Sequence, residues 1–303
     1  MRSWAGLRGL SSVLLGIAMV GLVAIRWPEI RSALWKIDLK WAVTGVVVFY
    51  INYLFRAIRL VTLLRGRISF WPDALWVACF HGFMTYLLPM RTGDLSLPIL
   101  LKTHYGLDLL EAGRVLVKAR MLDLMSLGGI TLIAAVGLPA PITPKFRFVW
   151  ASAGTLMALL PWILPKIVRF RFWEKFVIFR RVAEVGNATR FQFSETIWSF
   201  AIWMAVSGGF YCAARAIELP IGLGGVLFLV TVQLPLQLLP VQGIANAGNH
   251  EGGWITALSL LGIPAVEALR FALTSHALLL IYVLSIFPAL IFFRYFFSRP
   301  HRS

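Results

Sequence analysis

Six long, uncharged apolar runs constrain the fold of this 303-residue chain more than any other feature of its sequence. Each run is close to the roughly 20 helical residues that cross the hydrocarbon core of a bilayer. The runs are residues 9–25, 41–55, 124–144, 148–165, 196–214 and 277–293. Only 14% of the residues are charged and 59% are hydrophobic, a balance that soluble globular domains do not have. The sequence therefore predicts an all-α, polytopic membrane protein with about six transmembrane helices.

Two further apolar segments, residues 74–90 and 219–249, do not fit as ordinary transmembrane helices. The first ends in a proline and runs into the polar sequence MRTGD, and the second is interrupted by several glycines and prolines. Both residue types break a regular helix. We interpret the two segments as re-entrant or broken helical hairpins. The expected hinge residues are Pro89, Gly93, Pro240, Gly243 and Gly248.

The basic residues predict how the chain is oriented, because Lys and Arg collect in cytoplasmic loops of polytopic proteins. The chain has 29 Lys and Arg against 13 Asp and Glu. The basic clusters are Arg56, Arg59, Arg65 and Arg67, then residues 166–190, then Arg294, Arg299 and Arg302. When these clusters are placed on the cytoplasmic side of a cell (inner) membrane, both termini are also cytoplasmic. The first hairpin then enters from the cytoplasm and the second from outside, and residues 26–40 lie outside despite their basic excess.

An internal repeat links the two hairpin regions. The sequence YGLDLLEAGRVLVKAR at 105–120 aligns without a gap with LGIPAVEALRFALTSH at 261–276, so that Arg120 meets His276. Upstream, LLP precedes a glycine and an acid in both copies, Asp94 in the first and Glu251 in the second. We expect one repeat at about residues 41–138 and the other at about 196–293, within a single integral membrane domain, 1–303. Opposite entry of the hairpins makes this an inverted repeat, as in many transporters.

Ionisable and amide side chains near the two hairpins are the candidate substrate-binding residues. A charge at the bilayer centre costs about 2.5–3.5 kcal/mol on insertion scales, so such groups normally face a cavity or one another. The candidates are Arg91, Asp94, Arg120, Asp123, Asn249, His250, Glu251 and His276. Other interpretations stay open: Arg120 with Asp123 as a structural ion pair, Arg91 with Asp94 as a loop salt bridge, and His276 as a core histidine.

No motif for catalysis or metal binding is present. The chain has no G-x-S-x-G, HExxH or P-loop sequence, so we expect no catalytic residue and no cofactor. Cys79 and Cys212 lie in apolar stretches without the spacing of a zinc site or a disulfide framework. His250 and Glu251 are adjacent and so point to different faces of a helix, which argues against joint catalysis.

The segment LLPMRTGDLSLPILLKTHYGLDLLEAGRVLVKARMLDL resembles the lysylphosphatidylglycerol synthase transmembrane-region family, the flippase-like membrane domain of multiple peptide resistance factors and stand-alone relatives. The shared pattern begins with Pro89, Arg91, Gly93 and Asp94, and continues through Gly106, Glu111, Ala112, Arg120 and Asp123. Pro240, Gly243, Gly248 and Glu251 resemble the pattern of the family's second half. The resemblance implies lipid translocation or a role with lipid-linked glycans. The soluble aminoacyl-transferring domain is missing, so lysyl transfer is not predicted.

We therefore expect a non-enzymatic, flippase-like protein that binds an anionic phospholipid or a polyprenyl-phosphate-linked glycan headgroup and moves it between leaflets. Arg91 and Arg120 would hold phosphate, and Asp94, Asp123 and Glu251 would pair with them or with a cationic headgroup. Nucleic acid is not an expected partner, because anionic lipid explains the basic excess better. Two alternatives stay open: an intramembrane enzyme with Glu251 or Asp94 as base, and an accessory subunit bound to a lipid-synthesis partner. A homo-oligomer is also open.

Overall fold

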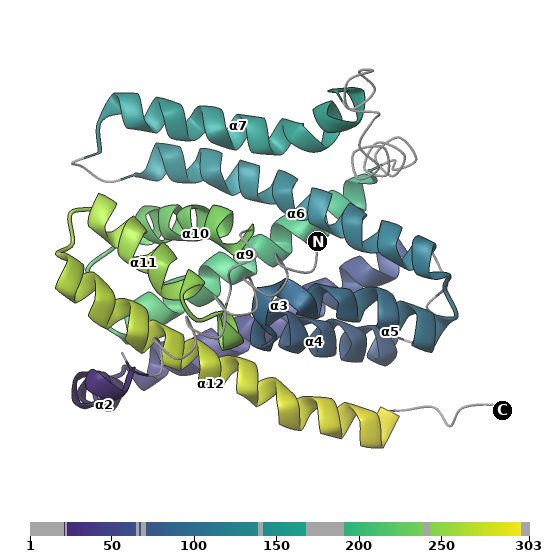
Figure 1. Ribbon diagram of the computed structural model, residues 1–303, viewed down its shortest axis with the longest axis horizontal. Coiled ribbons are helices and arrows are strands. Elements are labelled where there is room, and N and C mark those ends of the chain that lie inside the picture. Colours follow the sequence, from purple (N-terminus) through teal and green to yellow (C-terminus); the bar gives the residue numbers. More distant parts are fainter. Residues whose placement is uncertain are drawn as a thin grey trace, which may run out of the picture.

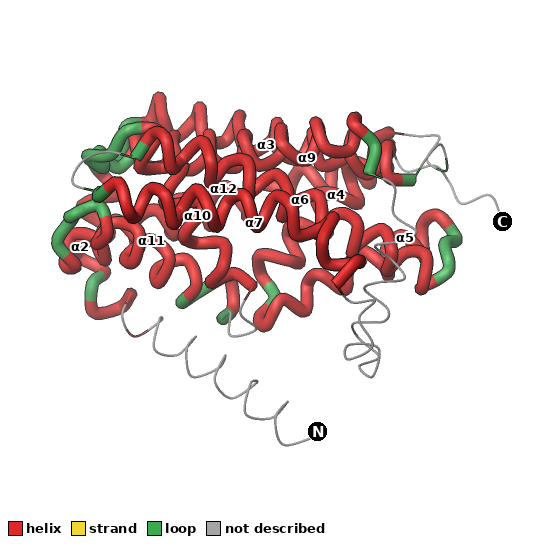
Figure 2. Tube along the Cα trace, turned by 90° about the horizontal axis from the view of Figure 1, so that it is seen from above, coloured by secondary structure: helices red, strands yellow, loops and turns green. Residues whose placement is uncertain are grey.

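The computed structural model describes residues 21, 23–64, 67, 71–138, 142–167, 191–238 and 243–297. Every regular element in these ranges is a helix, which confirms the all-α class. The elements are α2 Trp27–Trp35, α3 Leu39–Leu63, α4 Trp71–Leu87, η1 Pro89–Leu95, α5 Ser96–Tyr105, α6 Leu109–Gly137, α7 Pro144–Ile167, α9 Phe193–Ala216, α10 Leu223–Leu238, η2 Ile244–Asn246, α11 Asn249–Leu260 and α12 Ala265–Phe297. Figure 2 shows loops gathered at the two ends of the molecule and near its middle.

Five described helices, α3, α6, α7, α9 and α12, are long and apolar enough to cross a membrane. They run along the long axis in Figure 1 and correspond to five of the six predicted spans. The remaining span, residues 9–25, lies almost entirely outside the described residues. The chain is thus a multi-pass membrane protein.

Three predicted spans have the wrong limits. Helix α3 continues to Leu63 instead of ending at 55, α6 covers Leu109–Gly137 instead of 124–144, and α12 begins at Ala265 instead of 277. Each prediction began or ended a helix at a charged or ionisable residue. The structure keeps those residues inside the helices by pairing them, which removes the reason to exclude them from the membrane. Arg56 and Arg59 were therefore wrongly assigned to a cytoplasmic loop, since both lie within α3.

The two interrupted segments form hairpins that approach each other from opposite ends of the molecule. Helices α4 and α5, with the short 3-10 helix η1 between them, lie at one end in Figure 1, and α10 and α11 lie at the other. Their tips meet, because η2 contacts both η1 and α4. The hairpin prediction is confirmed, and the residues between the hairpin arms come together near the middle of the molecule.

The two halves use the same order of elements. The series α3, α4, η1, α5, α6 is repeated as α9, α10, η2, α11, α12. Gly106 follows α5 with φ +66°, and Gly262 follows α11 with φ +85°. A left-handed residue ends a helix at little steric cost only when it is glycine. The aligned glycines therefore end equivalent helices in the same way, which supports the alignment made from sequence.

Each hairpin packs into an apolar cluster of its own half. In the first half, Leu101 of α5 and Ala57 of α3 are completely buried together. In the second, Trp254 of α11 packs with Phe228 of α10 and Ala272 of α12. Apolar packing thus fixes each hairpin against its long helices. The polar residues at the tips are held in place by this packing.

Candidate functional site

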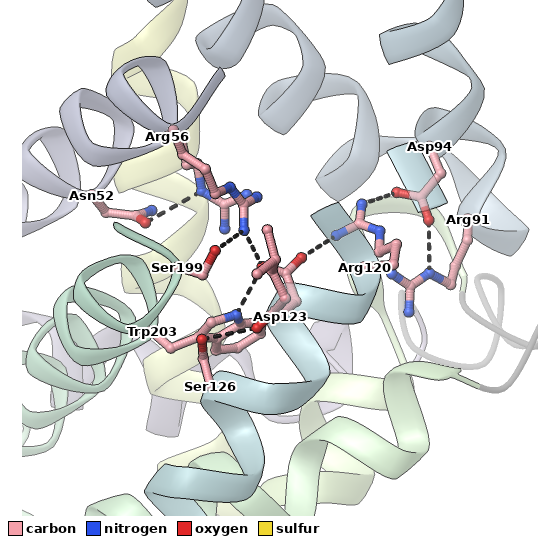
Figure 3. Close-up of polar contacts among 11 residues, drawn as sticks. Asn52, Arg56, Arg91, Asp94, Arg120, Asp123, Ser126, Ser199 and Trp203 are labelled. Carbon is pink, nitrogen blue, oxygen red and sulfur yellow. Dashed lines mark hydrogen bonds and ion pairs between the residues drawn. The ribbon is translucent and has the colours of Figure 1, made fainter. Parts of the chain in front are cut away.

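Five charged side chains form a continuous chain of contacts from α3 through α6 to η1 (Figure 3). Arg59 Nη1 lies 2.5 Å from Asp123 Oδ1, and Arg120 Nη1 lies 3.0 Å from Asp123 Oδ2. Arg120 Nη2 lies 2.5 Å from Asp94 Oδ1, and Arg91 Nε lies 3.3 Å from Asp94 Oδ2. The structure thus brings together all four residues predicted for the first half, and it adds Arg59.

Asp123 is the most enclosed member of this chain. Its side chain is 8% exposed, and its Oδ1 also accepts a hydrogen bond from Trp203 Nε1 at 3.1 Å. Arg59 Nη1 donates a second hydrogen bond to Ser199 Oγ at 3.2 Å. Ser199 and Trp203, both on α9, therefore cover one side of the site. Three donors from three helices thus satisfy this buried carboxylate. Asp123 therefore joins α3, α6 and α9, and the structural ion pair considered for Arg120 and Asp123 is present.

Arg120 is the bridge between Asp123 and the hairpin tip. Its two terminal nitrogens bind different carboxylates, one on its own helix and one on η1. Its Nε is buried without a hydrogen-bond partner, while the side chain as a whole is 33% exposed. A guanidinium can hold two anionic partners at once because its donors lie in a fixed planar fork. Arg120 thus retains a free, buried donor beside its two acids.

Sequence reasoning missed Arg56 and Arg59 as site residues. Arg56 Nε donates to Asn52 Oδ1 at 3.2 Å, and its guanidinium lies 5.7 Å from the centre of the Tyr53 ring. The signal was the spacing of Asn52, Arg56 and Arg59, which places all three on one face once the helix extends past residue 55. Figure 3 shows Asn52 and Arg56 on α3 above the Asp123 site.

A pocket lies beside this chain of charges, between α3, α4, α5 and α6. The empty space between its walls is about 440 Å³, a volume that includes the open solvent at its mouth. Its polar walls are Arg56, Arg59, Arg120 and His81, and leucines and alanines make up the rest. His81 Nδ1 lies 2.9 Å from Ser96 Oγ at the start of α5. A pocket with three guanidinium groups against aliphatic walls suits the junction between an anionic headgroup and an acyl chain.

In the second half, the equivalent position holds the pair Glu251 and His276. His276 Nδ1 contacts Glu251 Oε1, and His276 Nε2 lies 2.8 Å from the Ala245 carbonyl oxygen of η2. Glu251 Oε2 accepts from the Gly248 N–H at 2.8 Å, which caps the start of α11. Both side chains are less than 10% exposed. The acid and base matched by the repeat are therefore in contact in both halves.

His250 has different surroundings from Glu251. It is completely buried, its Nε2 lies 2.9 Å from Ser275 Oγ, and its Nδ1 lies 3.3 Å from Gln233 Nε2. Its ring also stacks against Phe210. The neighbouring Asn249 is 8% exposed, and its Nδ2 has no hydrogen-bond partner. His250 therefore has the contacts of a satisfied core histidine.

The predicted hinge residues have distinct local roles. Pro89 begins η1, and Gly93 is packed so closely against the Met84 carbonyl that any side chain would collide with it. The Gly243 N–H donates to the Ala247 carbonyl at 3.1 Å, and Gly248 has φ +83° directly before α11. Pro240 lies outside the described residues. These glycines shape the tips, and their role as moving hinges stays a prediction.

The two clusters face each other where the hairpin tips meet. Tyr86 of α4 presents the edge of its ring to His276, with ring centres 6.3 Å apart. Thr85 Oγ1, Tyr86 Oη and Asn246 Oδ1 are all buried without a hydrogen-bond partner. Each such atom costs about 1–3 kcal/mol. The meeting point of the tips thus concentrates unsatisfied polar groups inside a membrane protein.

Metal chemistry has no visible site in the described ranges. No group of three or more His, Cys, Asp or Glu side chains gathers there. Cys79 and Cys212 are buried free thiols on α4 and α9.

These features define a polytopic helical membrane protein. Its two hairpins extend from opposite ends of the molecule, and buried ionisable residues lie where their tips meet. The chain belongs to the lysylphosphatidylglycerol synthase transmembrane-region family, whose model matches residues 9–287. The match includes the site residues of both halves of the repeat. The family is a membrane domain connected with lipid biosynthesis. Comparisons with curated proteins and with solved structures give no match.

Proposed function

We propose that this protein binds the anionic headgroup of a phospholipid or a polyprenyl-phosphate-linked glycan and moves it between membrane leaflets. One observation carries the proposal: the site joins Arg59, Arg91 and Arg120 to only two aspartates, 94 and 123, and Arg56 lines the pocket beside them without a carboxylate of its own. The excess of two positive charges is held in the membrane part of the chain, where unbalanced charge is costly. An anionic headgroup would balance it.

The pocket beside these charges supports a lipid as the substrate. Arg56, Arg59 and Arg120 offer planar donors that match phosphate oxygens, and the aliphatic walls from Leu60 and Leu97 would contact the start of an acyl chain. Asp94 and Asp123 hold Arg120 in place, and Asp94 could also bind a cationic group on the lipid.

The meeting of the hairpin tips supports translocation. Inverted repeats place substrate sites near the bilayer midplane, between halves that rock against each other. The buried, unsatisfied atoms of Thr85, Tyr86 and Asn246 lie at that meeting point and would bind a headgroup on its way between the first half and the second. The two clusters adjoin, since η1 contacts η2 directly.

We infer that the end of the molecule where α3, α7 and α12 finish faces the cytoplasm of a cell (inner) membrane. In Figure 1 these three helix ends lie on one side, and the basic clusters of the sequence follow them. The charge pocket belongs to the hairpin that enters from this side. Lipid would therefore be taken up from the cytoplasmic leaflet.

The test is a translocation assay with purified full-length protein in proteoliposomes that contain headgroup-labelled phosphatidylglycerol. Loss of fluorescence after adding a membrane-impermeant quencher reports how much label reaches the outer leaflet. Arg120→Ala and Asp94→Ala should abolish protein-dependent translocation. Arg114→Ala is the matched control, because Arg114 is an exposed residue six positions earlier on the same helix. Equal rates for Arg120→Ala and wild type would remove the site assignment.

The same preparation separates the alternatives. Chemical conversion of the added lipid, found by mass spectrometry, would favour an intramembrane enzyme instead. If neither translocation nor conversion occurs, and a lipid-synthesis protein co-purifies, the accessory-subunit alternative replaces the proposal.

A further inference from the structure

The two halves pair equivalent residues but use different chemistry. In the first half Arg120 pairs with Asp94, and the guanidinium stays protonated under all ordinary conditions. In the second half His276 pairs with Glu251, and imidazole and carboxyl groups, unlike guanidinium, can exchange a proton with each other or with water. The duplicated contact is therefore a fixed ion pair in one copy and a proton-binding pair in the other.

The hydrogen bonds determine how many protons the second pair holds. His276 Nε2 faces the Ala245 carbonyl oxygen, which can only accept, so Nε2 carries a hydrogen. The contact between His276 Nδ1 and Glu251 Oε1 then needs one more hydrogen, on either atom. Imidazolium with carboxylate and imidazole with carboxylic acid both satisfy it. In either form the pair has no net charge and one shared proton.

A second proton would open this contact. With both Nδ1 and Oε1 protonated, two donors would face each other and the hydrogen bond would be lost. The pair would become imidazolium and carboxylic acid, with a net charge of +1. Because Glu251 caps α11 and His276 belongs to α12, the loss would remove one link between the second hairpin and its long helix, while the contact of His276 Nε2 with the Ala245 carbonyl oxygen stays.

Several titratable and charged groups face the Glu251–His276 pair from neighbouring elements. From α4 it is faced by Tyr86, and from α11 by His250, whose ring centre is 4.8 Å from that of His276. His250 is held by Gln233 of α10 and Ser275 of α12. From the neighbouring tip, η1, the charged groups are Arg91 and Asp94, which bind each other.

The polar surroundings leave room for new bonds. Asn246 of η2 directly follows Ala245, and Asn249 lies two residues before Glu251; both are more than 90% buried and have side-chain atoms without partners.

We propose that Glu251 and His276 together take up one proton as an anionic headgroup reaches the hairpin tips, and release it when the headgroup leaves. This inference rests on the proposed function and gives it a coupling ion. The balance is simple: one proton from water binds the pair, no covalent bond changes, and the same proton returns to water on the other side. The pair's charge of +1 offsets the charge of a monoanionic headgroup in a region where unbalanced charge is costly.

Proteoliposomes with an imposed pH difference test the coupling. One proton per headgroup allows accumulation of up to about tenfold for a difference of one pH unit, because both correspond to about 1.4 kcal/mol. Wild type should accumulate labelled phosphatidylglycerol on the side that the gradient favours. Glu251→Gln and His276→Asn should lose this accumulation. Glu267→Gln and His104→Gln are the matched controls. Both residues are exposed, Glu267 near the start of α12 and His104 near the end of α5, so these variants should still accumulate the lipid.

A transport-independent measurement separates the two proposals. Infrared difference spectra of the full chain, recorded at two pH values, should contain a carboxylic-acid band that Glu251→Gln removes and Glu267→Gln retains. Translocation by wild type without a response to the gradient overturns the coupling and leaves the proposed function standing. Spectra without a Glu251 band overturn the proton site itself. Absence of any translocation by wild type overturns the proposed function, and the band alone then decides the proton site.

Discussion

Arg59 of α3 binds Asp123 of α6 across 64 residues of sequence, and this contact ties two transmembrane helices together inside the charge cluster. Both side chains are only 8% exposed, so the contact is shielded from water in the folded protein. Arg120 also binds Asp123, but from the same helix, and it cannot replace the link to α3. The cluster is therefore a structural joint as well as a candidate anion site.

Arg59→Ala should destabilise the protein by about 1.5–3 kcal/mol, because it removes the charge-assisted hydrogen bond that joins α3 to α6, while Arg120 still pairs with Asp123. The measurement is unfolding in detergent, followed by tryptophan fluorescence. Arg67→Ala is the control, since Arg67 binds Glu111 at 2.9 Å on the surface and such pairs contribute only about 0–1 kcal/mol. Equal effects of the two substitutions would contradict the role assigned to Arg59.

Gly93→Ala should prevent correct folding of the first hairpin tip. A methyl group at this position would collide with backbone atoms of Met84 and Thr85, which cannot move without displacing α4. The amount of monodisperse protein on size-exclusion chromatography gives the readout. Gly113→Ala offers a matched comparison on α6, because a methyl group there meets no neighbouring atom and should gain up to about 1 kcal/mol of helix stability. A well-folded Gly93→Ala protein would show that the tip can open at that point.

Arg120→Lys keeps the charge but removes the fork that binds Asp94 and Asp123 at once. Losing one charge-assisted hydrogen bond costs about 1.5–3 kcal/mol, which predicts translocation about 10- to 100-fold slower than wild type. Initial rates in the labelled-lipid assay measure the effect, with Arg114→Lys on the exposed part of α6 as control. If the two variants transport equally fast, positive charge alone is sufficient at Arg120.

Thr85→Val removes a buried hydroxyl that has no partner and should stabilise the protein by about 1–3 kcal/mol while slowing translocation. The matched substitution is Thr131→Val, where the hydroxyl donates to the Leu127 carbonyl at 2.8 Å. That variant should be neutral or less stable, with normal translocation. Thermal unfolding and the lipid assay are measured on the same samples. A destabilised Thr85→Val protein would mean that its hydroxyl serves the fold.

The sequence predicted the helical class, the two hairpins and the pairing of Asp94 and Asp123 with arginines, because polar residues in apolar runs and an aligned repeat are visible without coordinates. It matched Glu251 to Asp94 and His276 to Arg120, but the contact between Glu251 and His276 was not predicted. It did not predict the ends of α3 or the contact between Arg59 and Asp123. Charge patterns alone cannot distinguish an arginine in a cytoplasmic loop from one buried by a distant acid. The difference depends on tertiary packing between α3, α6 and α9, which no local pattern encodes.

Opposite entry of the hairpins can be tested by chemical labelling. In a Cys79→Ala, Cys212→Ala background, Lys102→Cys places one thiol at the exposed end of α5, and Pro220→Cys places another in the exposed turn before α10. Figure 1 shows these segments at opposite ends of the molecule. A membrane-impermeant maleimide added to intact cells should label Pro220→Cys, while Lys102→Cys should react only after the membrane is opened. Labelling of both from one side would be incompatible with an inverted arrangement, because hairpins that enter through the same leaflet cannot exchange a headgroup between the two.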